Sequence, residues 1–258
     1  LAPDQSSASA LLRLEDVSRV FDIRRGLFGE KRSLVAVDGV SLSLAKGASL
    51  GLVGESGCGK STLGRLACGL LAPSQGQVLL EGRSLPPAAA HRSAAARIQM
   101  SSHDPFSPLP PRLTVGSSVA EPLAARGVSR EERHAQAEAM LATVGLEGMG
   151  RRYPHEFSGG QRQRIAVARA LITRPDVVVC DEPVSALDAS VQAQALNLLR
   201  EVQEQFGPAY LFISHDLAVV GFLCRRILVM YLGQIVEEGP TDAIFDGAAH
   251  PYTQALMA

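Results

Sequence analysis

Residues 54–62, with the sequence GESGCGKST, match the phosphate-binding pattern G-x-x-x-x-G-K-[S/T]. They lie between an apolar run that predicts a strand over Ser49–Val53 and a pattern that predicts a helix over 61–71. Glycines let backbone N–H groups curl around phosphate oxygens, and the helix N-terminus adds partial positive charge. An ordinary glycine turn is the alternative, but such a match arises by chance in a chain of this length only about once in a hundred.

Two side chains of this loop have distinct predicted tasks. Lys60 would reach the β- and γ-phosphates of a nucleoside triphosphate, and the Ser61 hydroxyl would ligate Mg²⁺. The residues expected to surround the phosphates are Gly54, Glu55, Ser56, Gly57, Cys58, Gly59, Lys60, Ser61 and Thr62.

A second candidate group is a pair of carboxylates, Asp181 and Glu182, at the end of an apolar strand expected over 177–180. In a phosphate-binding α/β fold this strand edge lies beside the γ-phosphate. We expect Asp181 to hold Mg²⁺ and Glu182 to act as the general base that polarises the attacking water. Seen alone, two acids here would as often be a solvated turn.

The third candidate is the start of a helix that runs to Leu171. Ser158 is a suitable N-cap, and the glycines after it permit close approach. A helix N-terminus directed outwards can also bind an anion, such as the γ-phosphate held by another molecule. The residues concerned are Ser158, Gly159, Gly160 and Gln161.

Together these motifs resemble the ATP-binding-cassette (ABC) family, whose signature LSGGQ appears here with Phe157 in place of Leu. The resemblance implies ATP and Mg²⁺ as ligands and adds three features. They are a D-loop at Ser185, Ala186, Leu187 and Asp188, a switch histidine at His215, and an adenine-stacking aromatic at Phe21. Read singly, His215 would more often be structural and Phe21 a core residue.

Within the family the sequence is most similar to peptide and nickel importer ATPases. Beyond the phosphate loop, this rests on SVQAQ at 190–194, MYLG at 230–233 and HPYT at 250–253. The resemblance implies a motor that drives uptake of oligopeptides, dipeptides or a similar solute. Its implied partners are a second, non-identical ATPase domain, two membrane-spanning permease subunits and, indirectly, an extracytoplasmic solute-binding protein. The implied location is peripheral, at the cytoplasmic face of the plasma (inner) membrane.

One position departs from this subgroup. The segment 99–105 reads QMSSHDP, so His103 stands where the subgroup has a glutamine that contacts Mg²⁺ and the attacking water. This leaves open a regulatory half of an unequal pair that binds ATP but scarcely hydrolyses it. A soluble ABC ATPase outside transport and an exporter are further alternatives.

The surrounding pattern predicts an α/β P-loop core with an antiparallel β subdomain and an inserted α-helical subdomain at about 113–165. Strands are expected over 14–21, 34–37, 40–44, 77–80 and 209–213, a helix over 190–206, and a hairpin over 226–239. Parallel strands joined by helices should form the core. Residues 1–10 have a linker-like composition, which favours a segment of a longer chain, and 11–258 should form the nucleotide-binding domain.

The composition narrows the function classes. The 258 residues are 46% hydrophobic, enough for a large core, and the formal net charge is −1, so we expect no nucleic-acid partner. The four cysteines lack the spacing of a zinc site or a disulfide framework and are expected to be reduced thiols. No apolar run approaches the roughly 20 residues that a membrane-spanning helix requires.

Overall fold

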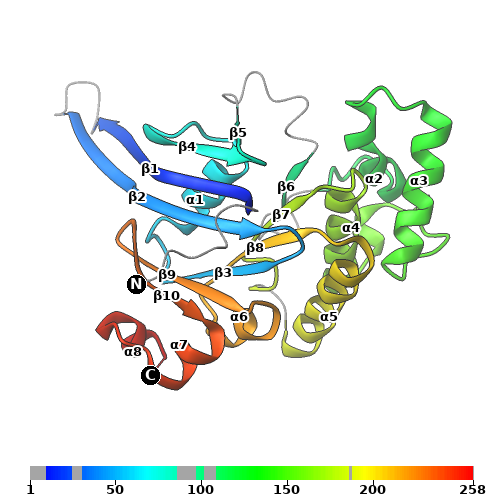
Figure 1. The fold of residues 1–258 in the computed structure, drawn as a ribbon. Helices are drawn as coiled ribbons and strands as arrows, with labels where there is room; N and C mark the ends of the chain where they lie inside the picture. The colour runs from blue at the N-terminus through cyan, green and yellow to red at the C-terminus, as the bar shows by residue number, and fades with distance from the viewer. Residues whose placement is uncertain (1–9, 25–30, 86–96, 102–108, 186–187, 258) are drawn as a thin grey trace. The chain divides into compact units, whose positions relative to one another are not determined.

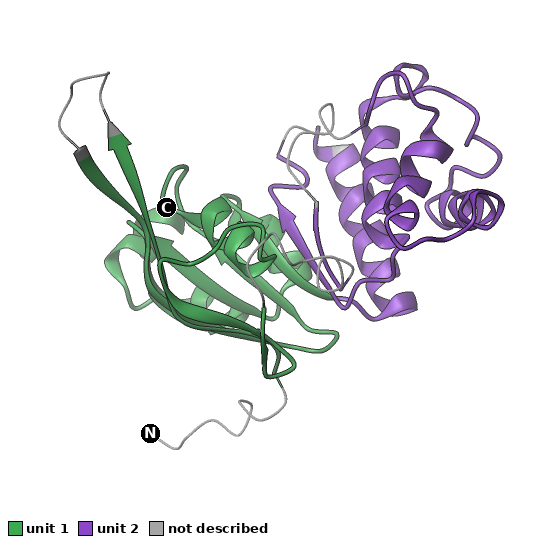
Figure 2. Cartoon of the chain, turned by 90° about the horizontal axis from the view of Figure 1, so that it is seen from above, with its two compact units in different colours: residues 1–91, 209–258 green, residues 92–208 purple. Residues whose placement is uncertain are grey.

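The computed structural model describes residues 10–24, 31–85, 97–101, 109–185 and 188–257. Two compact units divide the chain, one formed by residues 1–91 and 209–258 and the other by residues 92–208 (Figure 2).

Strands dominate the first unit. Its elements are β1 (Ala10–Arg24), β2 (Lys31–Ala45), β3 (Ser49–Val53), α1 (Lys60–Ala67), β4 (Gln75–Leu80), β5 (Arg83–Ser84), β8 (Ala209–Ser214), α6 (Leu217–Leu223), β9 (Arg226–Tyr231), β10 (Gln234–Pro240), α7 (Thr241–Gly247) and α8 (Pro251–Met257) (Figure 1).

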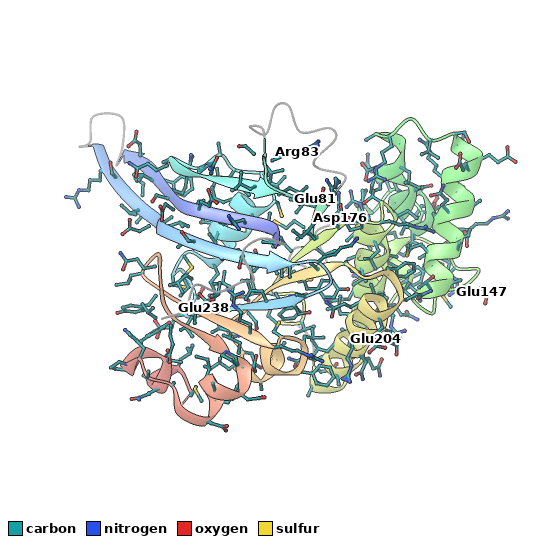
Figure 3. All side chains as sticks on the ribbon, viewed as in Figure 1. Glu81, Arg83, Glu147, Asp176, Glu204 and Glu238 are labelled. Carbon is teal, nitrogen blue, oxygen red and sulfur yellow. The ribbon has the colours of Figure 1, made fainter. Side chains whose placement is uncertain are left out.

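An antiparallel sheet contains the strands in the order β2-β1-β4-β5. The sequence predicted two strands over 34–37 and 40–44, but the structure joins them into the single strand β2. Gly39, with φ at 58°, and register shifts in the pairing with β1 take up the turn-type residues between the two runs. The turn between β4 and β5 is formed by Glu81 and Gly82, which both have positive φ. Glu81 and Arg83 are labelled in Figure 3.

The parallel part of the unit has β3 between β8 and β9. All six residues of β8 are buried, as expected for a continuous apolar run with layers on both faces. The predicted hairpin is formed by β9 and β10, and the chain continues into the short helices α7 and α8 (Figure 1). Helix α1 ends earlier than predicted, at Ala67, because Gly69 adopts a φ of 65°.

Helices dominate the second unit. Its elements are β6 (Ile98–Ser101), α2 (Val115–Ala124), α3 (Arg130–Thr143), a 3₁₀ turn (Pro154–Glu156), α4 (Gly159–Leu171), β7 (Val177–Asp181) and α5 (Ala189–Phe206) (Figure 2).

In this unit β6 pairs in parallel with β7, and helices α2, α3 and α4 pack on one another. Ser129 caps α3, with its hydroxyl accepting a hydrogen bond from the N–H of Glu132. Asp176, labelled in Figure 3, precedes β7 and forms an ion pair with Arg97 at 2.5 Å. Mixed parallel and antiparallel strands with inserted helices confirm the predicted fold class.

Candidate nucleotide-binding site

The phosphate loop connects β3 to α1, as predicted, and its glycines are required by conformation and, at Gly54 and Gly59, also by space. Gly54, Gly57 and Gly59 all have positive φ. A Cβ at Gly54 would lie 2.2 Å from the carbonyl oxygen of Met230, and one at Gly59 would lie 2.2 Å from that of Ala36. Any other residue would therefore push the loop away from the strands that support it.

The N-terminus of α1 provides the donors that a phosphate needs. The helix begins at Lys60, and Gly59 has no side chain that could cap it. The N–H groups of the first turn can therefore bond to atoms of the loop or to a phosphate bound in it. This arrangement fits the triphosphate of ATP, since helix N-termini at glycine-rich loops are anion sites. The Ser61 side chain is exposed there, where it could ligate Mg²⁺.

Lys60 is folded into the loop. Its side chain is only 4% exposed, and its ammonium group donates hydrogen bonds of 2.7 Å to the carbonyl oxygens of Gly54 and Glu55. These bonds satisfy a buried charge with neutral oxygens. A phosphate oxygen would be a stronger acceptor because it carries charge.

The hairpin between β9 and β10 supports the loop from behind. The N–H of Gly233 donates to the carbonyl oxygen of Cys58 at 2.9 Å. The carbonyl oxygen of Gly233 accepts from the backbone N–H of Asp38. Burial raises the pKa of the Cys58 thiol despite the nearby Lys60 charge, so this cysteine stays a neutral packing residue.

Tyr252, which belongs to the HPYT motif, also contacts the phosphate loop. The hydroxyl oxygen of Tyr252 accepts a hydrogen bond of 2.9 Å from the N–H of Glu55, inside the phosphate loop. The two residues are 197 positions apart. The HPYT motif was the one signal in the sequence, but it carried no indication of this contact.

Sheet register places His215 at the same edge as the phosphate loop. Val53 of β3 pairs with Ser214 of β8 in parallel, so Gly54 and His215 both follow directly from paired residues. Asp216 then caps α6 by accepting from the N–H groups of Ala218 and Val219.

Phe21 lies on β1 and is half-buried. The guanidinium of Arg19 lies 4.7 Å from the centre of its ring. This cation–π contact occupies one ring face. A role for Phe21 in stacking on adenine stays a prediction.

In the second unit the two predicted carboxylates follow one another at the end of β7. Asp181 is buried and Glu182 is half-buried with a φ of 48°, a strained conformation for a residue with a side chain. The carbonyl oxygen of Glu182 accepts from the Ser185 hydroxyl at 3.2 Å. Burial raises the pKa of the adjacent Cys180 thiol to about 12, so this thiol is not ionised.

The signature segment begins α4 with reciprocal capping. The Ser158 hydroxyl accepts from the N–H of Gln161 at 3.3 Å, and the Gln161 side chain accepts from the N–H of Ser158 at 3.0 Å. A Cβ on Gly160 would lie 2.5 Å from a methyl of Val191, whereas one on Gly159 would meet nothing within 4 Å. Phe157, which stands in place of the family's leucine, is buried.

The predicted D-loop is connected to the signature within this unit. Asp188 caps α5 by accepting from the N–H of Val191, the residue that packs against Gly160. Ser185 is exposed. Ala186, Leu187 and His103 lie outside the described residues.

The predicted Mg²⁺ ligands Ser61 and Asp181 belong to different units. Within the described ranges, no group of three or more His, Cys, Asp or Glu side chains could hold a metal by itself. The searched helices in those ranges include none that is long and apolar enough to cross a bilayer.

Comparison with known proteins supplies the family. The model of the ABC transporter family matches residues 37–185. The oligopeptide transport ATP-binding protein AppF of Bacillus subtilis is 49% identical over 98% of this chain and 79% of its own length. The dipeptide transport ATP-binding protein DppF of Escherichia coli is 47% identical over 96% of this chain and 75% of its own length.

A solved structure agrees with this match. The dimeric, post-hydrolysis ATP-binding cassette MJ0796 bound to ADP and Pi superposes with a TM-score of 0.76 at 27% identity, covering 89% of this chain and 98% of that one. The motifs, the fold and these comparisons lead to one conclusion, that the chain belongs to the ABC transporter family.

Proposed function

We propose that this ABC ATPase powers the import of oligopeptides, dipeptides or a similar small solute through membrane-spanning partner subunits. The observation that carries the proposal is the extent of similarity to the peptide importer subunits, which runs over 96–98% of the chain. It therefore extends well beyond residues 37–185, which the model of the ABC transporter family matches.

In the proposed reaction each site residue has one task. Lys60 would release the carbonyl oxygens of Gly54 and Glu55 and turn to the β- and γ-phosphates. Ser61 and Asp181 would supply oxygen ligands to Mg²⁺. Mg²⁺ would neutralise the phosphate charge that develops in the transition state. Glu182 polarises the attacking water, and the left-handed backbone at this residue supports the assignment because strain of this kind gathers at functional sites.

The signature segment acts on the ATP of a second domain. Support comes from the open space around Gly159 and from the capped N-terminus of α4, which is suited to an anion brought by a partner. MJ0796, to which this chain is similar, is dimeric. We propose that two ATPase domains pair head to tail, that the partner domain is not identical, and that the helical subdomain at about 113–165 transmits closure to the two permease subunits. A solute-binding protein would deliver the solute from the other side of the membrane.

The decisive experiment is solute-stimulated ATP turnover in the assembled transporter. The chain is purified with its membrane subunits and solute-binding protein, placed in lipid vesicles, and assayed with di- and oligopeptides and with unrelated small solutes. Peptides should stimulate turnover and accumulate in the vesicles. Stimulation by an unrelated solute alone would overturn the peptide assignment.

Glu182→Gln provides the control for chemistry. It keeps the length of the side chain, so ATP should still bind, while turnover falls by about 10²- to 10⁴-fold, the usual contribution of a positioned general base. ATP should then hold the paired domains together. Turnover within a few-fold of the parent would remove Glu182 from the mechanism.

A further inference from the structure

The HPYT segment near the C-terminus contacts the phosphate loop through one side chain. Tyr252 accepts the N–H of Glu55 at 2.9 Å, and its ring packs on Tyr231 with the ring centres 4.3 Å apart and the planes tilted by 38°. Tyr231 ends β9, and the preceding residue, Met230, is the one whose carbonyl oxygen leaves no room for a Cβ at Gly54. The same strand end therefore supports both the loop and the tyrosine that bonds to it.

Helix α8, which carries Tyr252, is itself fixed by Glu237 of β10. The Glu237 carboxylate accepts from the N–H groups of Ala249 at 2.6 Å and His250 at 3.1 Å, and Nδ1 of His250 accepts from the N–H of Tyr252. Thr253, the next residue, is fully buried. With both its backbone and its ring held, the Tyr252 hydroxyl has little freedom to leave the Glu55 amide.

The peptide group between Gly54 and Glu55, here called the Glu55 peptide, is thus held from two sides. Tyr252 accepts from its N–H, which belongs to Glu55, and the ammonium of Lys60 donates to its carbonyl oxygen, which belongs to Gly54. In the proposed reaction Lys60 leaves that oxygen for the phosphates, so its hold on the loop is lost when the nucleotide arrives. The Tyr252 bond uses a different atom of the peptide and can persist.

We propose that Tyr252 is a positioning residue for the phosphate loop: it keeps the Glu55 peptide in place when Lys60 turns to the nucleotide, and so makes the affinity for ATP depend on the seating of α8. The proposal rests on the assigned role of Lys60 but not on the identity of the transported solute. The Tyr252 hydroxyl bonds to a backbone N–H of the loop, so in this proposal it acts through the backbone.

The test is Tyr252→Phe, which removes the hydroxyl and keeps the ring stack. Affinity for a non-hydrolysable ATP analogue with Mg²⁺ is measured on the full-length protein, together with the thermal unfolding midpoint with and without the analogue. One neutral hydrogen bond corresponds to about a 3- to 10-fold change in an equilibrium constant. The dissociation constant should rise by that factor, and the analogue should raise the midpoint less than it does in the parent.

Tyr231→Phe is the matched control because it removes a hydroxyl from the other ring of the same stack without touching the Glu55 amide. Its affinity should equal that of the parent. In the assembled transporter, Tyr252→Phe should raise KM for ATP while kcat stays within about twofold, as expected for binding lost equally from ground and transition states. A purely structural role would instead lower the unfolding midpoint without nucleotide and spare the affinity.

Glu237→Gln weakens the attachment of α8 to β10 and so tests the role of Tyr252 without changing the tyrosine. If Tyr252→Phe does not fold, this variant provides the test. It should also weaken analogue binding, and combining it with Tyr252→Phe should give less than the product of the two effects, because both act through one hydrogen bond. Affinities within twofold of the parent in these variants would overturn the proposal. That result would leave peptide-stimulated turnover, the test of the proposed function, unaffected.

Discussion

Gly159 and Gly160 are neighbours in the sequence and differ in what their surroundings permit. The space around Gly159 is open, whereas a Cβ on Gly160 would meet a methyl of Val191 at 2.5 Å. Valine is stiff about its first side-chain torsion, so this methyl cannot easily move aside. A substitution at Gly160 therefore disturbs packing within its own chain, in addition to any effect on contact with a partner's nucleotide.

We expect Gly160→Ala to lower the free energy of unfolding by about 1–3 kcal/mol, the usual cost of overpacking. Gly159→Ala should leave that free energy within about 0.5 kcal/mol of the parent. Urea unfolding of the two variants measures both free energies and tests this difference. If Gly159→Ala nevertheless lowers ATP turnover in the assembled transporter, the loss arises at the partner's nucleotide; equal turnover would remove Gly159 from the composite site.

At the scale of single elements, the N-terminus of α4 has a structural task and a proposed binding task, and one substitution separates them. Aspartate caps helices about as well as serine, so Ser158→Asp should keep the unfolding free energy within about 0.5 kcal/mol of the parent. Its negative charge would repel the partner's γ-phosphate, so turnover should fall by at least about tenfold. Paired measurements of urea unfolding and ATP turnover test both statements.

Ser129→Asp is the control, because Ser129 caps α3 through the same kind of hydrogen bond. It should change neither stability nor turnover. If Ser158→Asp also turned over ATP at the parent rate, the N-terminus of α4 would not face a phosphate.

The attachment of α8 to β10 should depend on pH. Burial raises the pKa of Glu237, but the nearby Thr253 side chain and the hydrogen bonds from the amides of Ala249 and His250 outweigh it, so the pKa lies below its ordinary value of 4.5. Since the folded-state pKa is lowered, the charged form stabilises the fold above pH 4.5, and this stability is lost as the pH falls through the folded pKa. Urea unfolding from about pH 6 to about pH 3.5 should show a smaller loss of stability in Glu237→Gln than in the parent. Parallel curves would exclude Glu237 as the titrating group.

At the scale of the whole molecule, the question is whether two unequal sites drive the transporter. The answer depends on His103, which lies outside the described residues. Imidazole is shorter than a glutamine side chain, and its cationic form would repel Mg²⁺, so His103 would make this domain's own site the less active one. We expect hydrolysis in this domain's own site to be slower than in its partner's and to rise above about pH 6.5 as the imidazole loses its proton.

The measurement is ATP turnover from about pH 5.5 to about pH 8.5 in an assembled transporter whose other site is disabled. His103→Gln should raise turnover and flatten its dependence on pH. Identical rates and profiles for parent and variant would mean that the histidine has no catalytic consequence, and the unequal pair would lose its main support.

Local patterns in the sequence were sufficient for the phosphate loop, the carboxylate strand end, the capped start of α4 and the hairpin of β9 and β10. Each depends on residues within a few positions of one another, because glycine conformations, caps and strand alternation are short-range properties. The same reasoning split β2 into two strands. Turn-type residues at 38–39 resemble a break when read locally, and only pairing along the whole length of β1 shows that they form an irregularity within one strand.

The family and the chemistry of the site could therefore be read from the sequence, whereas the supports of the site could not. The Tyr252 hydroxyl and the Glu55 amide meet across 197 positions, and Val191 packs against Gly160 from a different helix. Such contacts follow from how strands and helices pack, which places distant residues side by side without leaving any periodic signal in the chain. The residues predicted to face the nucleotide are set by local chemistry, and the residues that hold them in place are set by the tertiary structure.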